Sequence, residues 1–417
     1  MHPASLHNLK ARFWSTVVLI LALSGCSGAP PRPAAEEVPP PARTETGRRT
    51  PVPVGPAPGP VAPGPSEVAG TRFIRVLVAE GPGRLTVSAN SLRAWDPGGR
   101  PVAEGTGNVV LAAVGERIRF GNAKLLGSSI DVAGTPDLRI DGRGLGGRVR
   151  VVARKGRILA VAAVPLEAYV AAVVSREAPP GFHREALAAQ AIAVRTYAAG
   201  SVRSPRDPEY DVAATVEDQV FEGTGDVLPV FREAAESTRG LMGWYGGEPA
   251  RTVFHSTCGG KTESAEGAWG RDVPYLRGQE CNDCLESPAY RWQYRMSAAE
   301  ARRVAEAVGV RAGADVRFAV AGRTPTGRAA RVRISSGGVE RDIKAAEFRK
   351  AAGYARVRSL RMEIAPAGDG WLFTGRGYGH GVGMCQFGAN GMARAGRGYR
   401  EILARYYPGV TVAREAP

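Results

Sequence analysis

Short segments in which apolar and polar residues alternate run from Thr71 to Val164. Examples are residues 73–78 (FIRVLV), 117–120 (RIRF) and 148–152 (RVRVV), and glycine, proline or asparagine residues separate such segments. An apolar residue at every second position is typical of a strand with one buried face. The pattern therefore predicts a β-rich N-terminal lobe of short strands.

A helical spacing replaces the alternation after this region. Leu166, Val170 and Val173 recur at intervals of three and four residues, and Pro165 suits the first turn of a helix. A second, alanine-rich helix is expected from Glu185 to Ala199. Further along, residues 298–308 predict a short helix, residues 315–343 two or three strands and residues 400–407 a helix. The predicted fold class is α+β: the β-rich lobe, a mixed α/β region around the first helix, and a smaller strand-rich lobe at residues 298–365.

The N-terminal segment has the pattern of an export signal. Lys10 and Arg12 precede an apolar run from Phe13 to Leu23, which is too short to span a bilayer comfortably, and Ser24-Gly25-Cys26 follows it. Small residues before a cysteine at this position resemble a bacterial lipobox. We therefore expect residues 1–26 to be a lipoprotein signal peptide with Cys26 lipidated; the alternative is a signal peptide with an incidental cysteine.

Proline is concentrated in the segment that follows. Of the 31 prolines, 13 lie between Pro30 and Pro65. Proline-rich chain favours the extended polyproline II conformation. Residues 27–70 are therefore predicted to be a disordered tether, and the β-rich lobe is predicted to occupy residues 71–138.

Charge narrows the choice of partner. The chain has 55 Lys and Arg against 40 Asp and Glu, a net charge of +15, and removal of Lys10 and Arg12 with the signal peptide lowers it to +13. A basic surface attracts nucleic acid, anionic membranes or acidic polymers. Export argues against nucleic acid, so the anionic cell wall and membrane are the expected partners.

Glu177 continues the apolar stripe of the first predicted helix. A carboxyl group beside apolar residues and at the negative end of a helix dipole is favoured in its protonated form, which suits a general acid. The alternative is that the helix ends before Glu177 and leaves it solvated, which Pro179-Pro180 would favour. Periodicity alone leaves both open.

On the second predicted helix, Gln190 and Tyr197 share an apolar face and Arg195 is adjacent. Polar groups on such a face either line a polar cleft or find partners in the core. Arg195 is therefore either a site residue or a surface charge.

Two chelating pairs predict a metal site. His255-x-x-Cys258 and Cys281-x-x-Cys284 are separated by 22 residues, a spacing typical of tetrahedral zinc. Four protein ligands would leave no position for a reactive water, so the zinc would be structural. The alternatives are a disulfide with a spectator histidine, and a catalytic metal from which one ligand stays away.

A glycine-rich segment runs from Gly375 to Gly388 (GRGYGHGVGMCQFG). The surrounding sequence lacks the βαβ unit and the following acidic residue of a dinucleotide site. Closely spaced glycines instead allow backbone to approach a ligand or another strand, and leave His380 and Gln386 little shielded. Cys385 is left over and is predicted to be a small buried residue.

These motifs together resemble the sporulation stage II protein D (SpoIID) group of lytic transglycosylases, which also includes the LytB-type amidase enhancers. The segments that carry the resemblance are residues 164–177, 189–197, 254–263 with 268–270, and 375–388 with 406–409. The resemblance extends over residues 139–412, which would form a SpoIID-like peptidoglycan-cleaving domain. Zinc ligation is not uniform in this family, so the zinc prediction depends on the chain's own four ligands.

The resemblance implies an activity and assigns residues to it. Glu177 would be the catalytic acid/base of a peptidoglycan lytic transglycosylase that acts on glycan strands, often without stem peptides, and leaves 1,6-anhydro-N-acetylmuramic acid ends. The alternative is a non-catalytic enhancer that binds glycan and stimulates an N-acetylmuramoyl-L-alanine amidase; a zinc hydrolase is a third hypothesis. The expected location is extracytoplasmic, as a periplasm-facing, membrane-anchored lipoprotein. The residues expected to bind sugar hydroxyls, N-acetyl groups or lactyl carboxylates are Arg195, Tyr197, Ser256, Lys261, His380 and Gln386.

Overall fold

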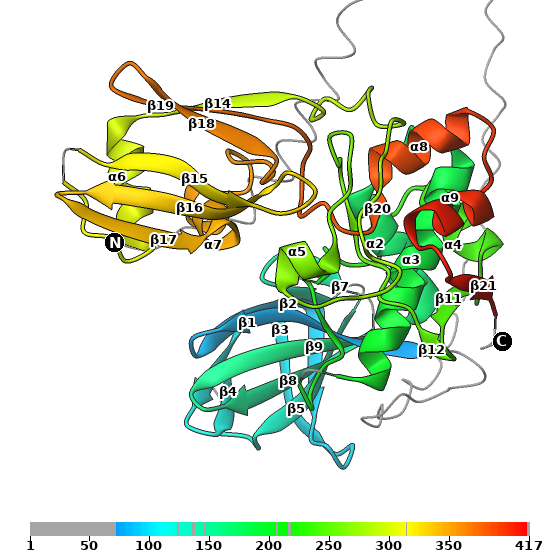
Figure 1. Cartoon of the computed structure of the whole chain (residues 1–417). Coiled ribbons are helices and arrows are strands. Elements are labelled where there is room, and N and C mark those ends of the chain that lie inside the picture. Colours follow the sequence, from blue (N-terminus) through cyan, green and yellow to red (C-terminus); the bar gives the residue numbers. More distant parts are fainter. Residues whose placement is uncertain are drawn as a thin grey trace, which may run out of the picture. The chain divides into compact units, whose positions relative to one another are not determined.

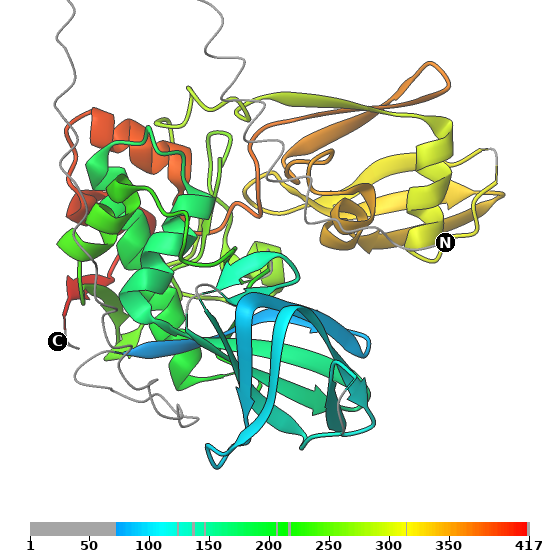
Figure 2. The same cartoon turned by 180° about the vertical axis from the view of Figure 1, so that it is seen from behind.

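The computed structural model describes residues 72–122, 125–135, 138–145, 147–205, 207–215, 218–313 and 315–414 (Figures 1 and 2). The predicted signal peptide, the predicted lipidation site at Cys26 and the predicted tether lie outside these residues. Within the described ranges, every helix is too short or too polar to cross a membrane. The mixture of helices and sheets confirms the predicted α+β class.

The described part of the chain begins with a sheet of ten strands, as the alternating pattern predicts. Buried residues alternate along parts of the sheet, as at Ile74, Val76 and Val78 on the first strand, whereas the central strand β9 has a continuous buried run. The strands are β1 (Phe73–Gly81), β2 (Arg84–Trp95), β3 (Pro101–Val114), β4 (Arg117–Phe120), β5 (Ser129–Thr135), β6 (Leu138–Ile140), β7 (Arg143–Leu145), β8 (Arg148–Arg154), β9 (Arg157–Pro165) and β10 (Val212–Ala213).

The strand order in this sheet is β10-β1-β9-β8-β5-β2-β3-β4, with β6 paired to β2 and β7. All pairings are antiparallel except that of β1 with the short β10. Strands β8 and β9 lie beyond residue 138 yet belong to this sheet, because β8 pairs with β5 and β9 pairs with β1. The sheet therefore leads without a break into the first helix, which starts directly after Pro165.

Helices α2 (Leu166–Glu177) and α3 (Arg184–Arg203) contain the two helices expected from the sequence and lie side by side (Figure 1). With α4 (Pro229–Ser237), they pack on the sheet through residues such as Val170 and Val194. The other face of α3, which includes Ile192, belongs to a second core. Small alanine side chains let α3 be buried on both faces.

The second core holds the C-terminal helices, the cysteines and most of the remaining motifs. Figure 1 shows α8 and α9 against α3. The elements of this region are β11 (Met242–Tyr245), β12 (Glu248–Pro249), β13 (Phe254–His255), α5 (Ala265–Trp269), β20 (Met384–Cys385), α8 (Gln386–Arg394), α9 (Tyr399–Tyr406) and β21 (Thr411–Ala413).

A third core forms the small lobe. It is built around Phe318, Phe348 and Phe373, whose rings contact one another. The lobe contains two three-stranded sheets, β14-β19-β18 and β15-β16-β17. Its elements are β14 (Trp292–Met296), α6 (Ala298–Ala307), β15 (Arg317–Arg323), β16 (Ala329–Ser336), β17 (Val339–Lys344), α7 (Ala345–Ala352), β18 (Met362–Ala367) and β19 (Gly370–Gly375).

Candidate functional site

Glu177 is the last residue of α2 and is partly buried. The alternative in which the helix ends before Glu177 is therefore wrong. The backbone N–H of Val220 donates to Glu177 Oε1 at 3.3 Å. The adjoining segment is fixed on α2, because the Tyr169 hydroxyl donates to Gln219 Oε1 at 2.8 Å and the Tyr169 ring stacks on Phe221. The segment after Asp218 thus holds the carboxyl group at the end of α2.

Tyr378, in the glycine-rich segment, lies within electrostatic reach of Glu177. Burial raises the pKa of the Tyr378 hydroxyl above its usual value, and the negative charge of Glu177 adds to the rise. Tyr378 and Thr257 exchange backbone hydrogen bonds of 2.7 and 3.0 Å. Tyr378 was not among the site residues predicted from the sequence, although its place in the glycine-rich motif was a usable signal.

The glycines of this segment pack against residues 253–258. A Cβ atom on Gly379 would lie 2.8 Å from the Cβ of His255, and one on Gly383 would lie 2.1 Å from the carbonyl oxygen of Val253. Both glycines have positive φ, +110° and +71°. The expectation that glycine permits a close approach to another strand is confirmed: β13 pairs with β20 in parallel.

His380 is a neutral imidazole with both ring nitrogens engaged. Its Nδ1 accepts from the backbone N–H of Val382 at 3.1 Å, so its Nε2 donates to the carbonyl oxygen of Phe254 at 2.9 Å. Burial lowers the pKa of His380 to about 4. The structure therefore ties the ring to the backbone of the site.

Four cysteines converge in the second core. The sulfur atoms of Cys258, Cys281, Cys284 and Cys385 all lie within 4.8 Å of one another, and all four residues are buried. Cys258 Sγ and Cys284 Sγ are 3.4 Å apart. A tetrahedral site with Zn–S bonds of about 2.3 Å has sulfur atoms about 3.8 Å apart, so the four thiols are close enough to hold a metal ion.

Backbone donors surround the cysteine sulfurs. The N–H groups of Cys258 and Gly388 donate to Cys385 Sγ at 3.2 and 3.3 Å, and the N–H of Gly260 donates to Cys258 Sγ at 3.4 Å. Such donors stabilise the negative charge of thiolate ligands. The donor set thus fits a metal that takes four thiolates.

His255 lies outside the cysteine group, so the structure differs from the predicted ligand set by one residue. Its Nδ1 lies 3.1 Å from the carbonyl oxygen of Val382, and burial lowers its pKa well below the usual value. Cys385, predicted only to be a small buried residue, supplies the fourth sulfur. Spacing could not reveal this, because Cys385 reaches the group through the pairing of β13 with β20.

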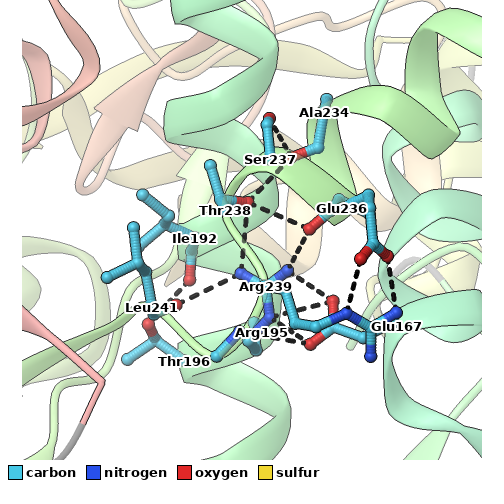
Figure 3. Close-up of polar contacts among 12 residues, drawn as sticks. Glu167, Ile192, Arg195, Thr196, Ala234, Glu236, Ser237, Thr238, Arg239 and Leu241 are labelled. Atoms are coloured by element: carbon cyan, nitrogen blue, oxygen red, sulfur yellow. Dashed lines mark hydrogen bonds and ion pairs between the residues drawn. The ribbon is translucent and has the colours of Figure 1, made fainter.

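Arg195 is fully buried between α2 and the C-terminal end of α4 (Figure 3). Its Nη2 lies 2.5 Å from Glu167 Oε2 and donates to the carbonyl oxygen of Ala235 at 2.9 Å. Its Nη1 donates to the carbonyl oxygen of Leu241 at 3.1 Å. The guanidinium is thus enclosed by protein acceptors, and both alternatives from the sequence, a surface charge and a substrate-binding residue, disagree with this placement.

The other predicted cleft residues have mixed environments. The Tyr197 hydroxyl donates to Asp218 Oδ1 at 2.8 Å, and Lys261 Nζ lies 3.0 Å from Glu280 Oε1. The Ser256 hydroxyl lies 3.3 Å from that of Thr257. Gln386 is buried, and its Nε2 has no partner among the described residues.

A turn of the small lobe inserts beside the cysteines. Arg328, 2% exposed, donates from Nη2 to the carbonyl oxygens of Cys258 and Lys261, both at 2.9 Å. Glu263 Oε2, also buried, accepts from the hydroxyls of Thr324 and Thr326, both at 2.6 Å. The small lobe therefore fixes the 258–263 loop, a contact that sequence spacing could not reveal.

Parts of the chain are similar to known proteins. Residues 154–245 match the SpoIID family model, described as stage II sporulation protein, and residues 274–383 match a domain of unknown function, DUF8618. An uncharacterized protein of Brachyspira hyodysenteriae is 34% identical over 248 residues, 59% of this chain and 66% of that protein.

Two named relatives come from Bacillus subtilis. Its amidase enhancer is 25% identical over 285 residues, 58% of this chain and 39% of the enhancer. Its stage II sporulation protein D is 32% identical over 266 residues, 60% of this chain and 75% of that protein. With three quarters of that relative covered, the chain belongs to the stage II sporulation protein D family.

Proposed function

We propose that this protein is a peptidoglycan lytic transglycosylase with Glu177 as its general acid/base. The observation that carries the proposal is the placement of Glu177: it is partly buried at the end of α2, and its Oε1 accepts a hydrogen bond from the Val220 N–H. A general acid needs a fixed carboxyl group with restricted access to water. Membership of the SpoIID family supports the same assignment.

In the proposed reaction, the protonated Glu177 donates its proton to the oxygen that links N-acetylmuramic acid to N-acetylglucosamine. The bond from that oxygen to C1 of the muramyl residue breaks. The Glu177 carboxylate then takes the proton of the muramyl C6 hydroxyl, and the C6 oxygen bonds to C1 to give the 1,6-anhydro sugar. Because the nucleophile belongs to the substrate, one carboxyl group serves both steps, unlike the carboxyl pair of glycoside hydrolases.

Digestion of purified, peptide-free glycan strands tests this proposal. Mass spectrometry should find anhydromuramyl ends with the wild-type protein, and Glu177→Gln should lower their yield at least about a hundredfold, as expected for loss of a general acid. Glu222→Gln is the matched control, since Glu222 pairs with Arg176 at 3.2 Å on the neighbouring segment. Equal product from wild type and Glu177→Gln would refute the proposal.

The second candidate is a non-catalytic enhancer of a cell-wall amidase. The amidase enhancer relative favours it. It predicts that addition of the Glu177→Gln protein still raises the rate of an N-acetylmuramoyl-L-alanine amidase on whole peptidoglycan. Anhydromuramyl ends formed by the wild-type protein alone would favour the enzyme.

We also propose that the four cysteines bind a structural Zn²⁺. Four thiolates close the coordination shell, so the ion would stabilise the fold and leave substrate binding to other residues. Zinc content measured by mass spectrometry should fall in Cys385→Ser and stay near one per chain in His255→Gln. Zinc lost from His255→Gln and retained in Cys385→Ser would instead support the ligand set expected from the sequence, with His255 in place of Cys385.

The predicted location remains part of the proposal. We propose that lipid on Cys26 anchors the protein to a membrane outside the cytoplasm, with residues 27–70 as the tether to the wall. Metabolic labelling with a radioactive fatty acid should mark the wild-type chain and fail to mark Cys26→Ser.

A further inference from the structure

Trp269 exposes a large aromatic surface beside the candidate site. It is the last residue of α5 and is 45% exposed, whereas Trp244 and Trp292 are 7% and 5% exposed. Single exposed apolar residues are common on protein surfaces, so the case for a binding role depends on the neighbours of the ring. Gly270, with a φ of +72°, ends the helix directly after it.

The indole ring has a charged neighbour. The guanidinium carbon of Arg251 lies 5.3 Å from the centre of the Trp269 ring, and Arg251 is exposed. The backbone of Arg251 is held in place, because its N–H donates to the Tyr275 hydroxyl at 2.8 Å. A positive charge near the ring at this distance is a cation–π contact.

The same ring contacts the glycine-rich segment. The centre of the His380 ring lies 5.4 Å from that of Trp269, and His380 is itself held to the backbone through both nitrogens. His380 lies two residues after Tyr378, whose hydroxyl pKa is raised by burial and also by the negative charge of Glu177. Trp269 therefore contacts the same glycine-rich segment that contains Tyr378.

We propose that Trp269 and Arg251 form a binding subsite for an N-acetylmuramic acid residue of the glycan strand. The flat, exposed part of the indole suits the C–H face of a pyranose ring, and Arg251 suits the carboxylate of the lactyl group. The two side chains together match a sugar that carries a negative charge. This inference rests on the proposed function for its ligand, but it concerns binding and is independent of the role of Glu177 in catalysis.

Binding to the Glu177→Gln protein tests the subsite without turnover. Isothermal titration should be performed with peptide-free glycan strands and with uncharged N-acetylglucosamine oligomers of similar length. Trp269→Ala should lower the affinity for both ligands at least about tenfold, whereas Trp269→Phe should retain part of the affinity. Arg251→Ala should lower chiefly the affinity for the glycan strand, so that the preference for the charged ligand over the uncharged one falls.

A second tryptophan–arginine pair provides the matched control. Arg148 lies 4.2 Å from the ring centre of Trp95 on the N-terminal sheet, and Trp95→Ala should leave both affinities unchanged. Unchanged affinity in both Trp269→Ala and Arg251→Ala would overturn the subsite, as would an equal loss in Trp95→Ala. Failure of the wild-type protein to form anhydromuramyl ends, with binding still dependent on Trp269, would overturn the catalytic proposal alone.

Discussion

Replacing Arg195 with methionine removes a cation that is 0% exposed. Its five acceptors are Glu167 Oε1 and Oε2, Thr238 Oγ1 and the carbonyl oxygens of Ala235 and Leu241 (Figure 3). Methionine fills much of the volume but donates no hydrogen bond. The substitution thus isolates the loss of the charge and its hydrogen bonds.

The expected loss of stability is set by the groups left behind. Removing one partner of a buried ion pair costs about 3–5 kcal/mol, because the remaining charge stays desolvated. The Glu167 side chain is 18% exposed and regains some water, which places the expected loss at the lower end, about 3 kcal/mol. The buried carbonyl group of Ala235 and the partly buried one of Leu241 lose their donors as well, so the loss should not fall much below this value.

Arg239 offers a control in the same region of Figure 3. It pairs with Glu236, but their side chains are 55% and 64% exposed, and exposed pairs contribute about 1 kcal/mol or less. Arg239→Met should therefore change the free energy of unfolding by less than about 1 kcal/mol.

Urea unfolding followed by circular dichroism measures both variants. A loss in Arg195→Met no larger than that in Arg239→Met would refute the reasoning from burial. Normal stability combined with lost glycan binding would show instead that Arg195 contacts substrate, as the family resemblance implies.

Three further substitutions test other contacts. Gly383→Ala should lower the free energy of unfolding by several times as much as Gly396→Ala. Both glycines have positive φ, but a Cβ at Gly383 would lie 2.1 Å from a backbone oxygen, whereas nothing lies within 4 Å of a Cβ at Gly396. Equal losses in the two variants would contradict this. The pKa of His380 is lowered from 6.5 to about 4 in the folded protein. Between these pH values the unfolded chain binds a proton at this histidine and the folded protein does not, so the free energy of unfolding should fall by up to about 3 kcal/mol as the pH falls from about 6.5 towards 4. Urea unfolding at a series of pH values should show that His380→Phe reduces the dependence of the free energy of unfolding on pH. An unchanged dependence would mean that other groups cause it. Arg328→Met should cost about 2–5 kcal/mol of stability, because Arg328 is 2% exposed and its loss leaves two backbone carbonyl groups without a donor, at about 1–3 kcal/mol each. The exposed Arg333→Met should cost less than about 1 kcal/mol.

Local patterns predicted some of the helices and much of the sheet, but not α4, α5, α7 or α8. Helices α2, α3, α6 and α9 follow from apolar residues spaced three and four apart, and the strands of the first sheet follow from alternation. These signals are local because each depends on which face of one element is buried. They can therefore be recognised in the sequence without knowledge of the rest of the fold.

The parts of the site that the sequence missed depend on contacts between distant segments. Arg195 finds its acceptors on α2 and at the end of α4, so its burial could not be read from its own helix. Cys385 joins the other three cysteines only through the β13–β20 pairing. A count of thiols was the available signal: with Cys26 assigned to lipid, four cysteines remain, the number that a closed zinc site takes.

The candidate site draws on all three hydrophobic cores. Glu177 ends a helix buried in the first core, the cysteines belong to the second, and Arg328 comes from the small lobe built on the third. The second core and the small lobe meet through glycine positions that exclude a Cβ and through polar contacts such as those of the buried Arg328 guanidinium. Because such contacts depend on a few atoms at short range, a single substitution in the small lobe should disturb the 258–263 loop while leaving the first core folded. The small lobe is in this sense a positioning element for the site.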